Sequence, residues 1–440
     1  MSVRSTSCVA RGLIVALAVT CGLACTSGGE TREPAVDGSR IEPTSNWERD
    51  LVATALSIDL SANHGVAVLS VASADAPGAS FEAWGLTIAS VSTDAGPLPF
   101  RFEGGVLDLG LAANEAAEVH VDYQFERHDQ ADGVFANGTV LTWPYFCGNV
   151  FPCKSTPADG LTFELSVTGA PAGDTIVFPK AIVANAPSYM AAWAVGRYAT
   201  LELGTTKHGR HVTVEYLPGE ESAAKKGAAH LRQAFEWLED TYGAYTFGDR
   251  VGSVSAAWGP EQYGGMEHHP LWHVASASID DEEVHVHEAA HGWFGNGVRI
   301  ACWEDLALAE GATTYLTARA LEAVAGKATS DAIWAMYDAE LDEAIATGDV
   351  VALPDGCGEI DVLTELFGMV PYMKGAYFFR DLELAIGRAK LDAALRAFYL
   401  AHVGEAARMT DLLAELAADT GFDPEPLADA WLRSLGRPDG

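Results

Sequence analysis

Three histidines and a glutamate crowd into the stretch VHVHEAAHGWFGN, residues 284–296. Imidazole and carboxylate groups can bind a metal ion or move protons, so this stretch is the first candidate for chemistry. On a helix, His287 and His291 lie four residues apart on one face, whereas His285, six residues before His291, points elsewhere. The spacing therefore predicts one cooperating pair, His287 and His291, and predicts that His285 is a packing or solvent-exposed residue.

The segment His287-Glu288-Ala289-Ala290-His291 is the H-E-x-x-H pattern typical of zinc peptidases. Two imidazoles one turn apart can bind one tetrahedral ion, and Glu288, projecting beside them, can take a proton from an attacking water. Glu310 follows in CWEDLALAEGATTYL, an otherwise small and apolar segment where a carboxylate is costly to bury unless it is paired or bound to metal. An exposed helical glutamate is the alternative, and the neighbouring motif favours the third zinc ligand.

Asp305 lies five residues before Glu310 on the same segment. It is predicted either to orient a ligand histidine or to be a surface acid.

A helix must present the motif. Ser278 and Asp281 resemble a capping box, the acidic residues 280–283 suit the positive end of a helix, and Gly-Asn-Gly at 295–297 is a stop signal. These signals predict a helix from about residue 280 to 294, with the histidines in its middle.

The spacing of apolar residues divides the rest of the chain into two regions. From residue 47 to 205 apolar residues alternate with polar ones, as in EVHVDYQF at 118–125 and LTFELSVT at 161–168, which predicts a β domain. From 206 to 440 helical spacing dominates, with a strand-like interruption at 250–275. The predicted fold class is α+β and multidomain, with an N-terminal β-sandwich or saddle followed by a mostly helical domain.

Composition limits the function classes. The 440 residues contain 61 acidic and 27 basic side chains, which gives a net charge of −34. Such a charge repels phosphate backbones, so nucleic-acid binding is not expected. The sequence gives no prediction of an oligomeric state.

The first 25 residues resemble an export signal, because basic residues precede the apolar run GLIVALAVTCGLA. The run ends in a lipobox-like GLAC at Cys25, with Gly22 where leucine is usual, so lipidation to a membrane tether and simple secretion both stay open. Residues 26–46 have the composition of a flexible linker. The protein is therefore expected to be exported, as a cell-envelope lipoprotein or in secreted or periplasmic form.

Export permits disulfides, and four cysteines follow the predicted signal and linker. Cys147 and Cys153 are close together in CGNVFPC, which favours their pairing and leaves Cys302 with Cys357. Four unpaired buried thiols are the alternative.

Several motifs together resemble the gluzincin aminopeptidases, the family of membrane alanyl aminopeptidase and leukotriene hydrolase. The motif residues are H-E-x-x-H with Glu310 after eighteen intervening residues, YGGMEHHP at 263–270 and VPYMKGAYFF at 370–379. The resemblance covers nearly the whole chain after the linker, as a short form without the family's long C-terminal helical domain. It implies a thermolysin-like catalytic domain over 206–440.

The resemblance also implies roles for individual residues. His287, His291 and Glu310 bind one zinc ion, and Glu288 is the general base that later hands its proton to the leaving amine. Tyr372 donates a hydrogen bond to the oxyanion. In the YGGMEHHP motif, Glu267 binds the free α-amino group of a peptide, and the backbone at Gly264 and Gly265 lines the cleft.

Two departures from the family pattern bear on specificity. His268 stands where the motif usually ends in asparagine, and Trp143 falls where the family has a Gln or Glu that helps to hold the amine. His268, His269 and His273 are predicted to line a pocket or lie on the surface, with extra metal ligation as the alternative.

The predicted function is a zinc metallopeptidase that removes N-terminal residues from peptides by attack of zinc-activated water. An endopeptidase or a hydrolase of a non-peptide substrate such as an epoxide is the first alternative. A catalytically dead surface binding module is the second.

Overall fold

The computed structural model of the chain describes residues 41–130, 132–258, 264–358, 360–362, 365–366 and 368–438. The predicted signal at 1–25, Cys25 and most of the predicted linker lie outside the described residues. Arg40–Gly440 cluster as one compact unit. Among the helices of the described part, none combines the length and apolar character that a membrane crossing needs.

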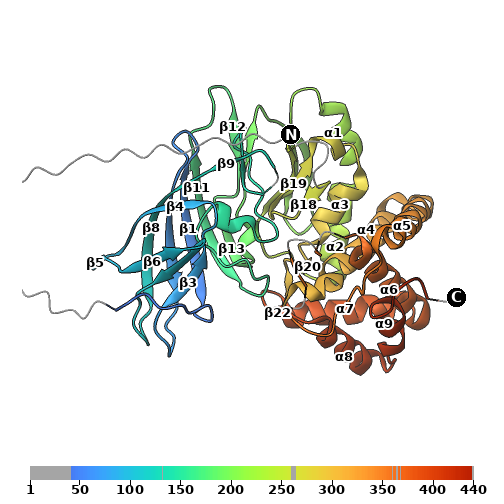
Figure 1. The fold of residues 1–440 in the computed structure, drawn as a ribbon. Coiled ribbons are helices and arrows are strands. Elements are labelled where there is room, and N and C mark those ends of the chain that lie inside the picture. The colour runs from blue at the N-terminus through green and yellow to red at the C-terminus, as the bar shows by residue number, and fades with distance from the viewer. Residues whose placement is uncertain are drawn as a thin grey trace, which may run out of the picture. The chain divides into compact units, whose positions relative to one another are not determined.

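The first part of this unit is built from strands, which lie side by side in blue to green in Figure 1. Its largest sheet has seven strands, in the order β13 (Ala181–Ala186), β11 (Leu161–Thr168), β1 (Leu51–Asp59), β2 (His64–Val71), β8 (Ala117–Phe125), β4 (Leu86–Thr93) and β5 (Gly96–Pro97). A three-stranded sheet joins β3 (Ala79–Glu82), β7 (Val106–Leu109) and β6 (Phe100–Glu103). Two strand pairs complete this part: β9 (Arg127–His128) with β10 (Val134–Phe135), and β12 (Thr175–Val177) with β14 (Ala194–Gly196).

The alternation of apolar and polar residues in the sequence matches the alternation of buried and more exposed side chains along the strands. In β8 the apolar Val119, Val121, Tyr123 and Phe125 are all buried, and the residues between them are not. Every second residue of β11, beginning at Leu161, is buried in the same way. The prediction of a β-rich first part with one face against the core is confirmed.

A second sheet of five strands supports the helical part. Its order is β15 (Ala199–Thr205), β16 (His211–Tyr216), β17 (Arg250–Ala256), β19 (Leu271–Ala275) and β18 (Gly265–Met266). The predicted boundary between residues 205 and 206 separates β15 from its hairpin partner β16. The two strands therefore belong to one sheet.

Nine helices lie in the described part of the region after residue 216. They are α1 (Glu221–Gly227), α2 (Leu231–Tyr242), α3 (Glu282–Ala290), α4 (Ala312–Ala325), α5 (Lys327–Gly348), α6 (Val370–Ile386), α7 (Arg388–His402), α8 (Met409–Thr420) and α9 (Glu425–Trp431). Four 3-10 turns also occur, at Phe146–Asn149, Ser188–Met190, Ser276–Ser278 and Trp303–Asp305. The short strands β20 (Phe294–Gly295), β21 (Val298–Ile300) and β22 (Ala406–Ala407) form a further small sheet. The mixed α+β class is confirmed, with strands first and helices after them.

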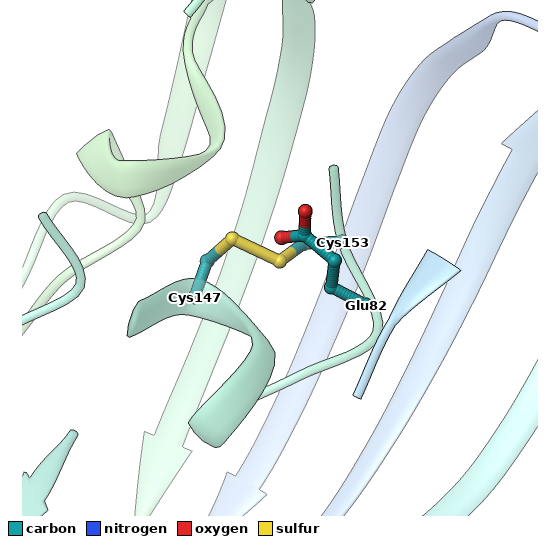
Figure 2. A group of neighbouring side chains, drawn as sticks. All are labelled: Glu82, Cys147 and Cys153. Carbon is teal, nitrogen blue, oxygen red and sulfur yellow. A yellow bond between two sulfur atoms is a disulfide. The ribbon is translucent and has the colours of Figure 1, made fainter. Parts of the chain in front are cut away.

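Both predicted disulfides are present, Cys147 to Cys153 and Cys302 to Cys357. Figure 2 shows the first of them with the Glu82 carboxyl beside it. Glu82 accepts hydrogen bonds from the backbone N–H and hydroxyl of Ser155, at 3.1 and 2.8 Å. Since both sulfur atoms are in the disulfide, this group does not offer thiolates to a metal ion.

Candidate active site

Helix α3 carries the paired histidines. It begins at its N-cap Asp281, whose carboxylate accepts a hydrogen bond from the Glu283 backbone N–H at 3.1 Å. It ends at Ala290, four residues earlier than predicted, because the chain turns at 291–293 to enter β20. His291 still has helical dihedral angles as the C-cap, so it stays one turn beyond His287 on the same face.

Three side chains converge at this face. The Nε2 atoms of His287 and His291 are 3.2 Å apart, and Oε2 of Glu310 is 3.2 Å from each of them. Ligands about 2.1 Å from a tetrahedral zinc ion lie about 3.4 Å from one another, so the set fits that ion. The side chains are only 12 %, 2 % and 4 % exposed, respectively.

The electrostatics of His287, His291 and Glu310 favour binding of a metal cation. Burial alone would disfavour charge on His291, but the opposite charge of Glu310 prevails and raises the pKa of His291 to about 10. Burial likewise opposes ionisation of Glu310, but the charge of His291 and hydrogen bonds from both imidazoles hold the pKa of Glu310 at about 2. An ionised carboxylate beside two imidazoles is a donor set suited to zinc.

The supporting hydrogen bonds orient His291 for ligation. Its Nδ1 lies 3.1 Å from the carbonyl oxygen of Phe294 and 3.4 Å from the Thr313 hydroxyl. When Nδ1 donates its hydrogen to that carbonyl, Nε2 is the nitrogen that faces Glu310 and His287, and it can bind a metal ion that displaces its proton.

Glu310 reaches the histidines through an irregular helix. It lies in a π-helical turn, Ala307–Gly311, that runs directly into α4. Such turns are frequent at functional sites. Gly311 packs against Gly375 of α6 so closely that a Cβ on Gly311 would lie 2.6 Å from the Gly375 Cα. This approach of two backbones brings α6, and with it Tyr372, next to Glu310.

The ring of Tyr372 stacks on that of His287. Its ring centroid is 6.1 Å from that of His287, with 17° between the planes. Burial, followed by the charge of Glu310, raises the pKa of the Tyr372 phenol well above its usual value. The phenol therefore keeps its proton at neutral pH and is able to donate a hydrogen bond.

Glu288 lines the same cavity, which has a volume of about 290 Å³. The side chain is 6 % exposed, and Oε2 has no hydrogen-bond partner among the described residues. Burial raises the pKa of this carboxyl well above its usual value. A buried carboxylate oxygen left free beside the ligand set is suited to accept a proton from water.

Gly265 in the edge strand β18 packs against this base. A Cβ at Gly265 would lie 2.3 Å from Oε1 of Glu288. The residue that would have to move is the flexible end of Glu288, so we expect Gly265→Ala to fold normally but to displace the base. Because misplacement of a reacting group by about 1 Å costs about 100-fold, kcat should fall by about that factor.

The comparison for this variant is Gly348→Ala, since nothing lies within 4 Å of a Cβ at Gly348. Steady-state hydrolysis and thermal unfolding of both variants are the measurements. Unchanged kcat in Gly265→Ala would mean that Glu288 does not act from this position.

Glu267 follows β18 and is 5 % exposed. Its backbone carbonyl accepts a hydrogen bond from Nδ2 of Asn296 at 2.7 Å, and the Tyr189 hydroxyl donates to Oδ1 of Asn296 at 2.9 Å. Burial and then the charge of Glu267 raise the pKa of Tyr189 well above its usual value, so the carboxylate and this phenol are close. Burial also raises the pKa of Glu267.

Sequence reasoning missed Tyr189 and Asn296. Tyr189 lies in a stretch without a motif, and Asn296 lies within HGWFGN but was interpreted only as part of a helix stop. Gly264 and Trp143 line the cavity with Glu267, as the resemblance implied for these positions.

The remaining histidines are buried. His285 lies between the Ser253 hydroxyl, at 2.7 Å, and the Ile279 carbonyl, at 3.0 Å, so its predicted packing role is confirmed. His269 lies between the Tyr245 hydroxyl and the backbone carbonyl of Glu288, at 2.8 and 2.7 Å. Its contacts position the base rather than bind a metal ion.

His268 and His273 are each 1 % exposed, with ring centroids 4.9 Å apart. Neither belongs to a metal-binding cluster among the described residues. A surface location was therefore wrong for His268, His269 and His273, because the strands around β19 are buried on all sides.

The prediction for Asp305 was also wrong. Its carboxylate is fully buried, pairs with Arg408 and accepts a hydrogen bond from the Met409 backbone N–H at 3.0 Å. It therefore anchors the start of α8 and neither orients a ligand histidine nor lies on the surface.

Comparisons with known proteins agree with this geometry. Residues 266–431 match the model of the peptidase family M1 domain. Leucine aminopeptidase 2 of Emericella nidulans is 28% identical over 332 residues, which are 66% of this chain and 51% of the relative. Leucine aminopeptidase 2-1 of Meyerozyma guilliermondii is 31% identical over 270 residues, 56% of this chain and 42% of the relative. The chain thus spans about half the length of the curated relatives it matches.

Solved structures show the same fold. An M1 zinc metallopeptidase from Deinococcus radiodurans superposes with a TM-score of 0.75 at 19% identity, covering 89% of this chain and 95% of that one. Native yeast LTA4 hydrolase gives a TM-score of 0.74 at 18% identity, covering 89% of this chain and 69% of that one. The strand-rich first part and the helical second part therefore have the same fold as these two solved structures.

Proposed function

Because residues 266–431 of this chain form a peptidase family M1 domain, we propose that the protein is a zinc-dependent aminopeptidase. The observation that carries the proposal is the triad of ligand atoms at mutual distances of 3.2 Å, in one cavity with the free carboxylate oxygen of Glu288. The substrates are peptides with a free N-terminus, from which single residues are released.

We assign one zinc ion to His287, His291 and Glu310. When bound there, zinc would polarise the substrate carbonyl and the attacking water. The fit rests on the spacing and the chemistry of two imidazoles and one carboxylate, which is a common ligand set of catalytic zinc sites.

Three further side chains around this site have separate roles in the proposed reaction. Glu288 takes a proton from the attacking water and delivers it to the leaving amine. The Tyr372 phenol donates a hydrogen bond to the oxygen that becomes negatively charged as the carbonyl is attacked. Glu267 accepts hydrogen bonds from the α-ammonium group, which fixes the first peptide bond at the triad.

Glu267 is the residue that makes the enzyme an exopeptidase, and Glu267→Gln tests this role. Hydrogen bonds to a charged group contribute about 1.5–3 kcal/mol, so kcat/KM for free peptides should fall by about 10- to 150-fold. N-acetylated peptides lack the ammonium group, so the wild-type protein should cleave them poorly and the variant should change that rate little.

Equal cleavage of free and acetylated peptides by the wild type would contradict the amine-binding role. It would favour the endopeptidase or non-peptide hydrolase. Trp143 is the feature that points to this alternative, because an indole cannot accept a hydrogen bond from ammonium. The presence of all three ligand residues, the base and the tyrosine argues against a catalytically dead binding module.

We further propose that the protein is exported. The basic and apolar segments within residues 1–25 support this, and so do the two disulfides, which are typical of oxidising compartments. Lipidation of Cys25 would tether it to a membrane, and mass spectrometry of the N-terminus of the natural protein distinguishes this from free secretion.

A further inference from the structure

The cavity at the active site holds two acids that the mechanism does not use. Its lining includes Glu283 and Glu340 in addition to Glu267, Glu288 and Glu310, and it includes no Lys or Arg among the described residues. Glu283 lies one turn before His287 on α3, and Glu340 comes from α5. Like charges held together in a partly buried cavity repel each other unless a cation joins them.

The contacts of Glu283 leave one carboxylate oxygen for a ligand. The Tyr337 hydroxyl donates to Oε1 of Glu283 at 2.5 Å. Burial raises the pKa of both Glu283 and Glu340, and the charges that act on them most come from neighbouring acids and from His287. Tyr337 thus holds Glu283 in place, and among the described residues neither Glu283 nor Glu340 forms an ion pair with a Lys or Arg.

A separate observation points to a missing hydrogen-bonding group in the same place. Thr314 of α4 lines the cavity and is 1 % exposed, and its hydroxyl has no hydrogen-bond partner among the described residues. Buried hydroxyls are nearly always hydrogen-bonded. An ammonium group offers three N–H donors, and Glu283, Glu340 and Thr314 offer acceptors.

The position of this acidic pair along α3 indicates which part of a peptide would reach it. Glu283 and His291 are about 12 Å apart along the helix axis, with His287 between them. Ligand atoms of Glu267 and His291 lie within 4.8 Å of each other, whereas Glu283 lies on α3 one turn before His287, on the side away from His291. The amine-binding acid and the acidic pair thus lie toward opposite ends of the ligand set.

We propose that Glu283 and Glu340, with Thr314, form a subsite that binds the cationic side chain of a Lys or Arg that follows the cleaved bond. The proposal rests on the proposed function for the direction of the peptide, since the α-ammonium group is placed at Glu267 and the scissile carbonyl at the triad. The leaving peptide then extends toward Glu283. The enzyme would select peptides whose second residue is basic, whatever residue is removed.

The test compares two tripeptide amides, Ala-Lys-Ala and Ala-norleucine-Ala, which differ by the ammonium group. The ratio of their kcat/KM values cancels any general loss of activity. We expect the wild type to prefer lysine by about 10- to 100-fold, the range for a hydrogen-bonded charge pair. Glu283→Gln and Glu340→Gln should each lower the ratio, and the double variant should bring it close to one. Glu282→Gln is the matched control, because the Glu282 carboxylate contacts His230 outside the cavity.

A binding measurement separates this proposal from the proposed function. The dissociation constants of both tripeptide amides for zinc-loaded Glu288→Gln protein should show the same preference for lysine without any hydrolysis. If the protein binds the lysine peptide preferentially but the wild type cleaves neither peptide, the result would support the subsite and contradict the aminopeptidase. Cleavage of both tripeptides at equal rates, or a preference that survives the double variant, would overturn the subsite and leave the aminopeptidase intact.

Discussion

Glu288→Gln should lower kcat by about 1,000-fold, within the range that general acid–base catalysis contributes. Glutamine has nearly the same shape but cannot take a proton from the attacking water or deliver one to the leaving amine. Because Oε2 of Glu288 is buried without a hydrogen-bond partner, the amide should not lose any protein contact of that atom. Zinc content and thermal stability should therefore stay close to those of the wild type, while turnover is lost.

The control for this variant lies on the same helix. Glu282→Gln likewise removes a carboxylate from α3, but Glu282, at the start of the helix, contacts His230 and does not line the cavity. Its kcat should be unchanged. Retention of more than about a tenth of wild-type kcat in Glu288→Gln would mean that another group moves the proton.

Glu310→Gln should release the metal. The amide removes the negative charge that holds the pKa of His291 high, and it leaves two neutral imidazoles as the remaining ligands. Loss of an outer hydrogen bond to a ligand already costs about 10- to 100-fold in metal affinity, so loss of a charged ligand should cost more than about 100-fold. Zinc per chain after dialysis, measured by mass spectrometry of the metal, should fall from one to near zero, and peptide hydrolysis should fall with it.

Glu322→Gln provides the matched control in the same helical segment, since Glu322 of α4 pairs with Arg388 away from the ligands. It should keep full zinc content. Zinc retained at one ion per chain by Glu310→Gln would show that the third ligand lies elsewhere.

The convergence of the proposed zinc ligands could be predicted because the spacing of the two histidines is dictated by helix geometry. His287 and His291 share a face in any helix that contains both, and Glu310 stood out as a carboxylate in an apolar segment. The strands β8 and β11 could be predicted equally directly, because a strand buried on one face requires apolar and polar residues to alternate.

The features that the sequence did not reveal depend on contacts between distant segments. Tyr189 forms a hydrogen bond with Asn296, 107 residues later in the sequence, and Asp305 forms an ion pair with Arg408, 103 residues later. No local pattern encodes such pairs. The close packing of Gly311 on Gly375 and the π-helical turn at Glu310 likewise arise from tertiary packing, which overrides the regular helix that the local sequence favours.

The same limit applies to the sheet to which residues 199–205 belong. Residues 199–205 alternate as other strands of the first part do, and only their pairing with β16 assigns them to the second sheet.

We propose above all that Glu267 and the zinc ligands together produce sequential removal of N-terminal residues. The most direct test is a mass-spectrometric time course of one unblocked decapeptide with zinc-loaded protein. We predict a ladder of products, each shorter by one residue from the N-terminus, that is absent when the same peptide is acetylated. Internal fragments, or identical products from both forms, would contradict the exopeptidase.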